Sequence, residues 1–293
     1  MGCAQQSAVL LRCLIVAVLA LSSAIPRAQP PAAVEIPFDW RDGLLWVKVA
    51  VPQSTNLLNF LVDSGANVSV VDLSLARRLG LKLGRRVEVR GVNARAEGYW
   101  PVALSAAAAG AALPDNFLAV DLSRLSQSCV CSVDGLLGAD FFLERVVQID
   151  FDKKTIRLFE RAVASTNGEI LPLEIRRGVL QLQVEVNNAA PGWVRLDTGC
   201  ASSLEWVVSH HPPRAESFKM SIGLAEIRIP ESLLNVRLGS RKHSVLAGLH
   251  ERELFPSERG LLGTGFLSRF ARVTVDAKGG RLILERRPLD EEQ

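Results

Sequence analysis

Asn59-Phe-Leu-Val-Asp-Ser-Gly-Ala-Asn67 is an apolar run that ends in an aspartate, a small hydroxyl residue and a glycine. The apolar residues predict a short buried strand. Gly65 predicts a tight turn directly after that strand, where the backbone can adopt a positive φ. We therefore expect Asp63 to lie at the end of a strand, on a turn too small to bury its side chain.

The same pattern occurs a second time as Trp193-Val-Arg-Leu-Asp-Thr-Gly-Cys-Ala201, and Asp197 follows Asp63 by 134 residues. A single Asp-Ser-Gly tripeptide is a weak signal, because all three residue types are common in turns. Here each copy is followed by the motif Gly-Leu-Leu-Gly, which begins at Gly135 and again at Gly260. The paired occurrence of both motifs is a strong signal of a duplicated unit.

The segments that flank these motifs also repeat. Residues 43–51 resemble residues 178–186, which precede the second aspartate, and residues 148–158 resemble residues 273–284, which follow the second Gly-Leu-Leu-Gly. The repeat has a period of about 125 to 135 residues, which is much longer than the unit of a solenoid. The sequence therefore predicts two homologous lobes.

The two Asp-Ser/Thr-Gly loops, each followed by Gly-Leu-Leu-Gly, resemble those of the pepsin/retropepsin-like aspartic proteases. The resemblance extends over about residues 36–287 and is specific at these four motifs. It implies an all-β, bilobal, acid-protease-like double barrel with a pseudo-two-fold axis and a few short helices. Each lobe is close in size to a retropepsin subunit, so the chain resembles two such units fused in tandem. We expect the lobes at residues 38–163 and 168–287, divided by the polar segment 162–170.

The N-terminal residues predict export. Residues 1–24 contain one early positive charge, an apolar run and small residues at their end, which is typical of a secretory signal peptide. The apolar run is shorter than the roughly 20 residues of a comfortable membrane span. Residues 25–37 are rich in Pro and Ala and predict an extended linker. We expect a periplasmic or secreted protein, with an uncleaved membrane anchor at residues 8–24 as the alternative.

Composition excludes several other classes of function. The net charge is only +3, with acids and bases interspersed and no basic block, so nucleic acid is not an expected partner. Beyond the signal segment only Cys129, Cys131 and Cys200 remain, which is too few for a disulfide scaffold. The paired histidines in residues 209–213 have no carboxylate or thiol at ligand spacing. We interpret them as part of a solvated loop and expect neither a metal nor a cofactor.

The resemblance implies that Asp63 and Asp197 form a catalytic dyad. Two carboxyl groups held close together share one proton, because both cannot easily be ionised. The ionised member can take a proton from a water, and the protonated member can polarise a peptide carbonyl. Homologous lobes related by a pseudo-two-fold axis would bring the two loops together. The resemblance gives roles in bracing the loops, or next to the water, to Ser64, Gly65, Thr198 and Gly199.

Residues 87–100 predict a hairpin, which the resemblance implies is a flap over the substrate. Gly91, Asn93 and Tyr99 are the candidate flap residues. Tyr99 would hydrogen-bond to the substrate there, and the alternative is a half-buried aromatic residue on a strand. The middle of lobe two is irregular and contains Pro212-Pro213, which argues against a full helix. The sequence does not decide whether lobe two has a second flap.

Two shorter segments of lobe one have their own predictions. Residues 73–79 predict a short helix that begins after Asp72 as N-cap and ends at Gly80. Residues 106–112 are almost all alanine and predict a loop.

The sequence departs from the family pattern directly after each glycine of the loops. Pepsin-like enzymes often have a hydroxyl residue there that donates to the catalytic carboxylate, whereas this chain has Ala66 and Cys200. Alanine has no side-chain donor and a thiol is a weak one. With fewer donors the pKa values of the dyad should be less depressed. We therefore predict activity at weakly acidic to neutral pH.

The resulting hypothesis is an aspartic endopeptidase, active as a monomer, that binds a polypeptide in an extended conformation. A membrane would be a partner only if the N-terminal segment stayed uncleaved. The alternative is a catalytically inactive, protease-like module that binds a peptide or protein. A periplasmic ligand-binding β protein with unrelated Asp turns is disfavoured by the duplication.

Overall fold

A computed structural model describes residues 34–92, 94–161, 168–208, 217–221 and 227–287 of the chain. These residues are mostly in β-strands, with four helices of four to six residues among them. This confirms the predicted all-β class with a few short helices. None of the helices in the described ranges is long and apolar enough to cross a membrane. The predicted signal peptide, residues 1–24, lies outside the described residues.

The predicted linker is too long by four residues. Strand β1 (Val34–Arg41) begins at Val34 and pairs with β12 (Thr155–Phe159), so residues 34–37 belong to a sheet. Proline in this segment made it resemble a linker. Pro37 is tolerated because β1 pairs only with β12 there and with β2 only from Phe38 onward, which leaves one edge of the strand free at the proline.

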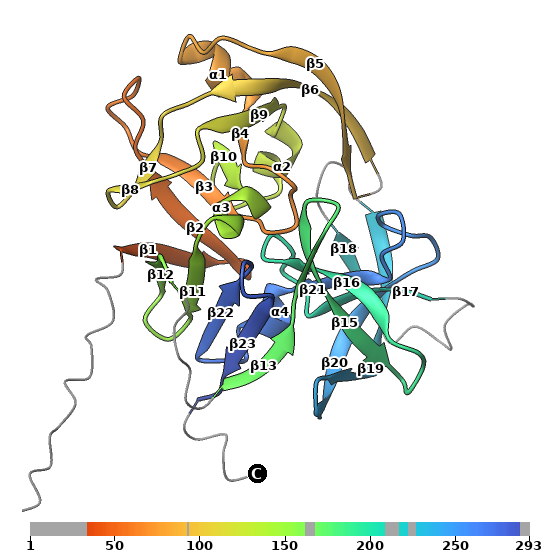
Figure 1. Cartoon of the computed structure of the whole chain (residues 1–293). Helices are drawn as coiled ribbons and strands as arrows, with labels where there is room; N and C mark the ends of the chain where they lie inside the picture. The colour runs from red at the N-terminus through yellow and green to blue at the C-terminus, as the bar shows by residue number, and fades with distance from the viewer. Residues whose placement is uncertain (1–33, 93, 162–167, 209–216, 222–226, 288–293) are drawn as a thin grey trace, which may run out of the picture. The chain divides into compact units, whose positions relative to one another are not determined.

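Three strands from each lobe form a shared sheet in the order β13, β23, β22, β11, β12 and β1. Figure 1 shows β11 and β12 of lobe one beside β22 and β23 of lobe two. The predicted boundary, residues 162–170, falls between β12 and β13, and residues 162–167 are outside the described ranges. The additional strands of the shared sheet are β11 (Val146–Asp150), β13 (Gly168–Pro172), β22 (Arg272–Asp276) and β23 (Arg281–Glu285).

The register of β11 against β22 locates the pseudo-two-fold axis. Gln148 is paired with Thr274, its own counterpart in the sequence repeat, and its Nε2 donates a 3.0 Å hydrogen bond to the Thr274 hydroxyl. The neighbouring pairs are Val147 with Val275 and Ile149 with Val273, so exchanging the two lobes reproduces the same pairing. A two-fold axis through the Gln148–Thr274 pair explains this pattern, and the bilobal prediction is confirmed.

The rest of lobe one is a sheet in the order β2, β3, β10, β4, β9, β6 and β5. Parallel and antiparallel neighbours alternate from β2 to β6, with β3–β10 and β4–β9 as the parallel pairs, and the last pair, β6–β5, is antiparallel. Its strands are β2 (Leu44–Val49), β3 (Leu58–Val62), β4 (Val70–Asp72), β5 (Arg85–Gly91), β6 (Ala94–Ala103), β9 (Asn116–Val120) and β10 (Gly135–Leu137).

Lobe two repeats this sheet in the order β15, β16, β21, β17, β20, β19 and β18, with β14 added at the edge. The parallel pairs recur at the equivalent places, β16 with β21 and β17 with β20. The duplication seen in the sequence is therefore a duplication of strand topology. The strands are β14 (Glu174–Arg176), β15 (Val179–Val186), β16 (Gly192–Asp197), β17 (Leu204–Val207), β18 (Ser217–Ser221), β19 (Ile227–Leu238), β20 (Arg241–His250) and β21 (Gly260–Gly263).

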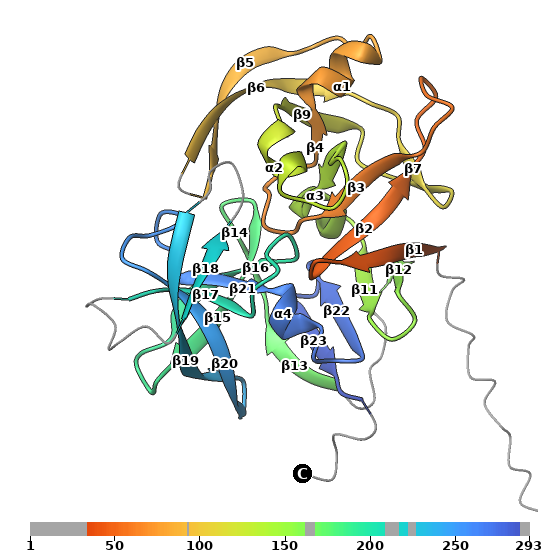
Figure 2. The same cartoon turned by 180° about the vertical axis from the view of Figure 1, so that it is seen from behind.

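Each lobe has a hairpin at the end of its sheet, as seen from behind in Figure 2. In lobe one it is β5–β6, the hairpin that the sequence predicted. In lobe two β18 pairs with β19, at the topologically equivalent position. A second hairpin, which the sequence left undecided, is therefore present. The paired histidines of residues 209–213 lie outside the described residues.

Of the two short segments of lobe one, the predicted helix is present, whereas the predicted loop contains two short strands. Helix α1 (Leu73–Arg78) begins after Asp72, whose side chain accepts a 2.8 Å hydrogen bond from the Leu75 amide. Gly80 follows the helix with a φ of 68°, as expected of a C-terminal glycine. Residues 106–112, predicted as a loop, contain the small ribbon of β7 (Ala107–Ala108) and β8 (Ala111–Ala112). Helices α2 (Ser123–Gln127), α3 (Ala139–Leu143) and α4 (Thr264–Leu267) complete the list of elements.

The buried apolar residues form two clusters. The larger one is continuous through both lobes and contains the shared sheet. The smaller one lies only in lobe one, and the hairpin residues Val87, Val89 and Trp100 pack against it. We call this smaller cluster the apolar layer; its members are Leu44, Trp46, Leu61, Val70, Leu118, Val120, Leu122, Val133 and Leu136.

Candidate active site

The two aspartates lie at strand ends, as the sequence predicted, but Asp197 is buried, so the expectation that such a turn cannot bury the side chain is wrong there. Asp63 directly follows β3, and its amide donates a 2.8 Å hydrogen bond to the Leu137 carbonyl of the first Gly-Leu-Leu-Gly. Asp197 is the last residue of β16 and is paired with Gly263 of the second motif. Each Gly-Leu-Leu-Gly forms the strand that pairs with the strand leading to an aspartate, β10 with β3 and β21 with β16. These motifs therefore pack beside the Asp loops and support them.

The two loops hold each other through reciprocal hydrogen bonds. The Ser64 amide donates to the Thr198 hydroxyl over 2.9 Å, and the Thr198 amide donates to the Ser64 hydroxyl over 3.0 Å. Each hydroxyl in turn donates over 2.8 Å to a carbonyl of the opposite strand, Ser64 to Leu196 and Thr198 to Val62. Both side chains are fully buried. Four bonds that cross between the lobes thus fix the spacing of the aspartates.

Gly65 and Gly199 lie against the opposite aspartate. A Cβ added to Gly65 would lie 2.4 Å from the Asp197 carboxyl carbon, and one added to Gly199 would lie 2.5 Å from that of Asp63. Neither glycine has a positive φ, so the backbone conformation expected from the sequence is wrong. Glycine is required here because each loop backbone approaches the carboxyl group of the other lobe.

The two carboxyl groups are hydrogen-bonded to each other. Asp63 also accepts hydrogen bonds from the amides of Gly65 (3.1 Å) and Ala66 (3.2 Å), whereas Asp197 accepts one from Gly199 (2.9 Å). Donors to a carboxylate favour its charged form. The amides of Gly65 and Ala66 therefore favour the charged form of Asp63.

Burial raises the pKa of both aspartates above its ordinary value. The pKa of Asp197 is raised further, first by burial and then by the nearby negative charge of Asp63. Hydrogen bonds from Asp197 and from the two backbone amides partly offset the effect of burial on the pKa of Asp63. The pair can thus hold one proton between its two members over a pH range above the ordinary pKa of an aspartate.

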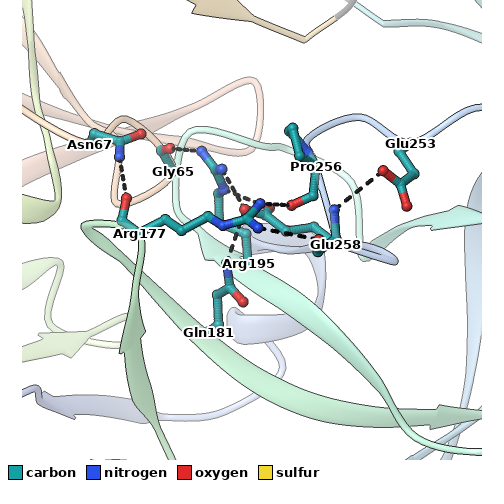
Figure 3. A network of polar contacts seen from close by, with 9 residues as sticks. Gly65, Asn67, Arg177, Gln181, Arg195, Glu253, Pro256 and Glu258 are labelled. Atoms are coloured by element: carbon teal, nitrogen blue, oxygen red, sulfur yellow. Dashed lines mark hydrogen bonds and ion pairs between the residues drawn. The ribbon is translucent and has the colours of Figure 1, made fainter.

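Arg195 is a buried cation at the site that sequence analysis missed. It lies two residues before Asp197 on β16, so both side chains point to the same face. Its guanidinium binds both carboxylate oxygens of Glu258, at 2.9 and 2.7 Å, and donates a 2.6 Å hydrogen bond to the Gly65 carbonyl (Figure 3). Its positive charge lowers the pKa of both aspartates, against the larger effect of burial.

Glu205 and His250 form a second buried polar pair in lobe two. The His250 Nε2 and a Glu205 carboxylate oxygen are 2.7 Å apart, and both side chains are more than nine-tenths buried. They lie on the neighbouring parallel strands β17 and β20. Both line the same cavity as the aspartates.

The repeat itself contained the signal for these polar residues. Equivalent strand registers match four polar residues of lobe two to four members of the apolar layer in lobe one. A charge at a position where the other copy has a buried aliphatic residue is a departure that must be compensated. The matched pairs are Arg195 with Leu61, Glu205 with Val70, His250 with Val120, and Glu258 with Val133.

A cavity of about 820 Å³ lies above the two aspartates. One side is formed by the apolar layer, and the β5–β6 hairpin adds Val87, Val89 and Trp100 to its lining. The other side is formed by lobe two and contains Arg195 and the Glu205–His250 pair. The volume falls in the range of ligand pockets, roughly 300–1,000 Å³. The cavity can thus hold several side chains of an elongated ligand.

The candidate flap residues have different positions. Gly91 lines the cavity, and Asn93 lies outside the described residues. Tyr99 is partly buried against the larger core cluster, and the next residue, Trp100, lines the cavity instead. Successive side chains of a strand point to opposite faces, so the expected substrate contact of Tyr99 is wrong and its alternative, a half-buried aromatic on a strand, describes it.

The cysteines and acidic residues form no metal centre in the described part of the chain. No three His, Cys, Asp or Glu side chains there are grouped as metal ligands. Cys129 and Cys131 are free thiols that pack against the apolar layer. Burial, followed by the effect of Cys131, raises the pKa of the Cys129 thiol to about 11, so it is not an activated nucleophile.

The comparison with protein families agrees with this geometry. Residues 47–141 match the family model described as aspartyl protease. The matched segment contains the first Asp loop, the β5–β6 hairpin and the first Gly-Leu-Leu-Gly. No curated protein matches the chain. Over residues 47–141 the chain is therefore similar to the aspartyl proteases of the retropepsin type.

Proposed function

We propose that this protein is an aspartic endopeptidase that hydrolyses peptide bonds with a water activated between Asp63 and Asp197. The observation that carries the proposal is the contact of these two buried carboxyl groups at the base of a cavity lined by both lobes. Two carboxyl groups that share one proton can act together as base and acid.

We assign each aspartate a part in the reaction, because two backbone amides donate to Asp63 and favour its charged form. Asp63, as the anion, takes a proton from the water, whose oxygen attacks the carbonyl carbon of the peptide bond. Asp197, as the acid, gives its proton to the carbonyl oxygen, so a neutral tetrahedral diol forms. The proton on Asp63 then passes to the leaving nitrogen while the carbon–nitrogen bond breaks. Asp197 recovers its proton from the diol, which becomes the new carboxyl group.

The cavity favours an extended polypeptide as substrate. Its lining combines the apolar layer with the backbone edge of the β5–β6 hairpin, which offers amide and carbonyl groups for pairing with an added strand. The apolar layer suits a large aliphatic or aromatic side chain beside the scissile bond. Both lobes contribute an aspartate from one chain, which supports action as a monomer.

We also propose that the protein is exported to the periplasm or the medium. Residues 1–24 have the composition of a signal peptide. An uncleaved anchor at residues 8–24 is the alternative. The two are distinguished by N-terminal sequencing of the protein made in its host, since a signal peptide would be absent from the mature chain.

A peptide library tests the proposed activity most directly. Wild type, Asp63→Asn and Asp197→Asn would be compared from about pH 3 to 8, with Asp39→Asn, an exposed residue, as the matched control. We expect either dyad substitution to abolish cleavage and the control to keep it. If folded wild type binds library peptides and cuts none, the protein is a peptide-binding module instead.

A further inference from the structure

The two lobes differ most at the residue that precedes each aspartate by two positions. In lobe one it is Leu61, a member of the apolar layer, and in lobe two it is Arg195. A buried arginine is unfavourable unless its charge is paired and its donors are satisfied. Arg195 is 5% exposed and meets both conditions through Glu258 and the Gly65 carbonyl. Such a costly replacement in a duplicated fold indicates a use.

Arg195 is held rigidly in its position. Glu258 grips the guanidinium with both oxygens and is itself fixed by a 2.9 Å hydrogen bond from Gln181. The guanidinium carbon lies 3.6 Å from the centre of the Phe255 ring, which covers the other face of the group. Because the planar guanidinium is fixed in this way, its Nη1 points toward the first Asp loop, where it donates to the Gly65 carbonyl.

A second arginine joins the same segment of lobe two to the same loop of lobe one. The Asn67 side chain donates a 2.7 Å hydrogen bond to the Arg177 carbonyl. The Arg177 guanidinium in turn donates to the Pro256 carbonyl (Figure 3). It also donates to the Ser257 hydroxyl. Residues 253–258 thus reach the first Asp loop through two arginines. The equivalent positions in lobe one are Asp42 and Leu61, so the arrangement is one-sided.

We propose that Arg195 is a positioning residue for the dyad. Its guanidinium, fixed by Glu258, holds the Gly65 carbonyl of the first loop and places a permanent positive charge beside both Asp loops. The inference rests on the proposed endopeptidase function. It assigns to lobe two a part in setting the geometry and the proton affinity of the aspartate on lobe one.

The predicted effect on pH dependence has a definite sign. A nearby cation favours the charged form of a carboxyl group, so the loss of Arg195 raises the pKa of Asp63 and of Asp197. Both limbs of the pH–kcat/KM profile then move to higher pH. The other charged or titratable groups that line the cavity are Asp42, Glu88, Arg90, Cys129, Arg177, Cys200, Glu205, His250 and Glu258.

The decisive variant gives lobe two the residues of lobe one. Arg195→Leu with Glu258→Val removes both charges together, so that no buried carboxylate is left unpaired. We expect a folded protein whose two limbs lie about one pH unit higher and whose kcat falls at least about tenfold, because the first loop has lost its anchor. Arg195→Lys keeps the charge and loses the fork, so its limbs should stay near those of wild type while kcat falls.

Arg237→Leu with Glu185→Val is the matched control, because it removes a half-exposed arginine–glutamate pair with the same substitutions. It should leave both limbs and kcat unchanged. If the Arg195 double variant melts at a lower temperature and loses activity equally at every pH, the residue is only structural and the proposal fails. Unchanged limbs and unchanged kcat would also overturn it.

A titration separates this inference from the proposed function. The carboxyl carbons of Asp63 and Asp197 can be followed by NMR in the folded, labelled protein, with Asp→Asn variants for assignment. We expect both titrations to shift upward in Arg195→Leu/Glu258→Val even if no peptide is cleaved. If wild type cleaves nothing and the titrations do shift, the endopeptidase proposal fails and the effect of Arg195 on the dyad stands. If the titrations do not shift, the proposed role of Arg195 is refuted.

Discussion

At the scale of single residues, the site depends on close approach. Gly65 and Gly199 are needed because each faces the carboxyl group of the opposite lobe, and this could not be predicted from the turn that they make. The proposed assignment of the shared proton to Asp197 depends in the same way on which backbone amides donate to each carboxylate. The local sequence identifies both aspartates but does not predict which amides donate to each of them.

Gly65→Ala should abolish activity while leaving most of the protein folded. The new methyl would lie 2.4 Å from the Asp197 carboxyl carbon and would push the dyad apart, so we expect kcat to fall by at least about a hundredfold. Gly80→Ala is the control: its φ of 68° makes alanine strained there, with open space around it. It should lower stability by about 1 kcal/mol and keep kcat. An active Gly65→Ala enzyme would contradict the assigned contact.

Asp197→Asn should stabilise the folded protein at neutral pH. A raised pKa means that the folded state holds a proton that the unfolded state has lost, so the Asp197 contribution to stability falls as the pH rises above the unfolded value of 3.8. Asparagine mimics the protonated form and does not titrate. We expect a melting temperature a few degrees above that of wild type at about pH 7, and the same as wild type at about pH 3. Equal melting temperatures at both pH values would show that the pKa of Asp197 is not raised.

At the scale of elements, the strands were predictable and their exact partners were not. Short apolar runs marked β3 and β16, the repeated segments 43–51 and 178–186 contain β2 and β15, and the hairpin predicted at residues 87–100 is β5–β6. The sequence left the β18–β19 hairpin undecided because the proline pair next to it suggested irregular structure. Of the two aromatic residues on β6, the sequence singled out Tyr99 as a candidate flap residue. Trp100 lines the cavity instead, because the register of the strand decides which of its faces meets the cavity.

Trp100→Leu should weaken binding of substrates with large apolar side chains. Trp100 packs on the apolar layer and lines the cavity, so the smaller side chain removes contact surface from the pocket. We expect KM for such peptides to rise about three- to tenfold with a smaller change in kcat. Tyr99→Phe, on the opposite face of the same strand, is the control and should leave KM unchanged. A larger effect from Tyr99→Phe would mean that the register of β6 is wrong.

At the scale of the molecule, the two lobes are joined by one sheet and one core. The shared sheet places three strands of each lobe side by side, and the larger core cluster continues through both. The Gln148–Thr274 bond lies where the pseudo-two-fold axis crosses that sheet. We therefore expect residues 34–287 to unfold as a unit, with the dyad held together by the same contacts.

Thr274→Val should destabilise the protein by about 1–3 kcal/mol, because the buried Gln148 amide loses its hydrogen-bond acceptor. Adding Gln148→Leu should restore much of that loss, since neither side chain then has an unpaired polar group. Denaturant unfolding of the two single variants and the double variant measures the coupling. Additive effects would show that the two side chains do not interact across the axis. Two separate transitions in wild type would contradict unfolding as a unit.

The sequence alone determined the two Asp loops, the duplication and the all-β lobes, because strand periodicity, turn residues and repeats are local or self-similar patterns. Tertiary structure decided which polar groups meet. Arg195 and Glu258 are 63 residues apart, and Arg195 and Gly65 are 130 residues apart and lie in different lobes. Contacts of this kind depend on how the sheets pack, and a charged side chain in a buried strand shows only that a partner must exist. The packing of the two lobes supplies that partner and, with it, the different roles of two aspartates whose sequences are nearly the same.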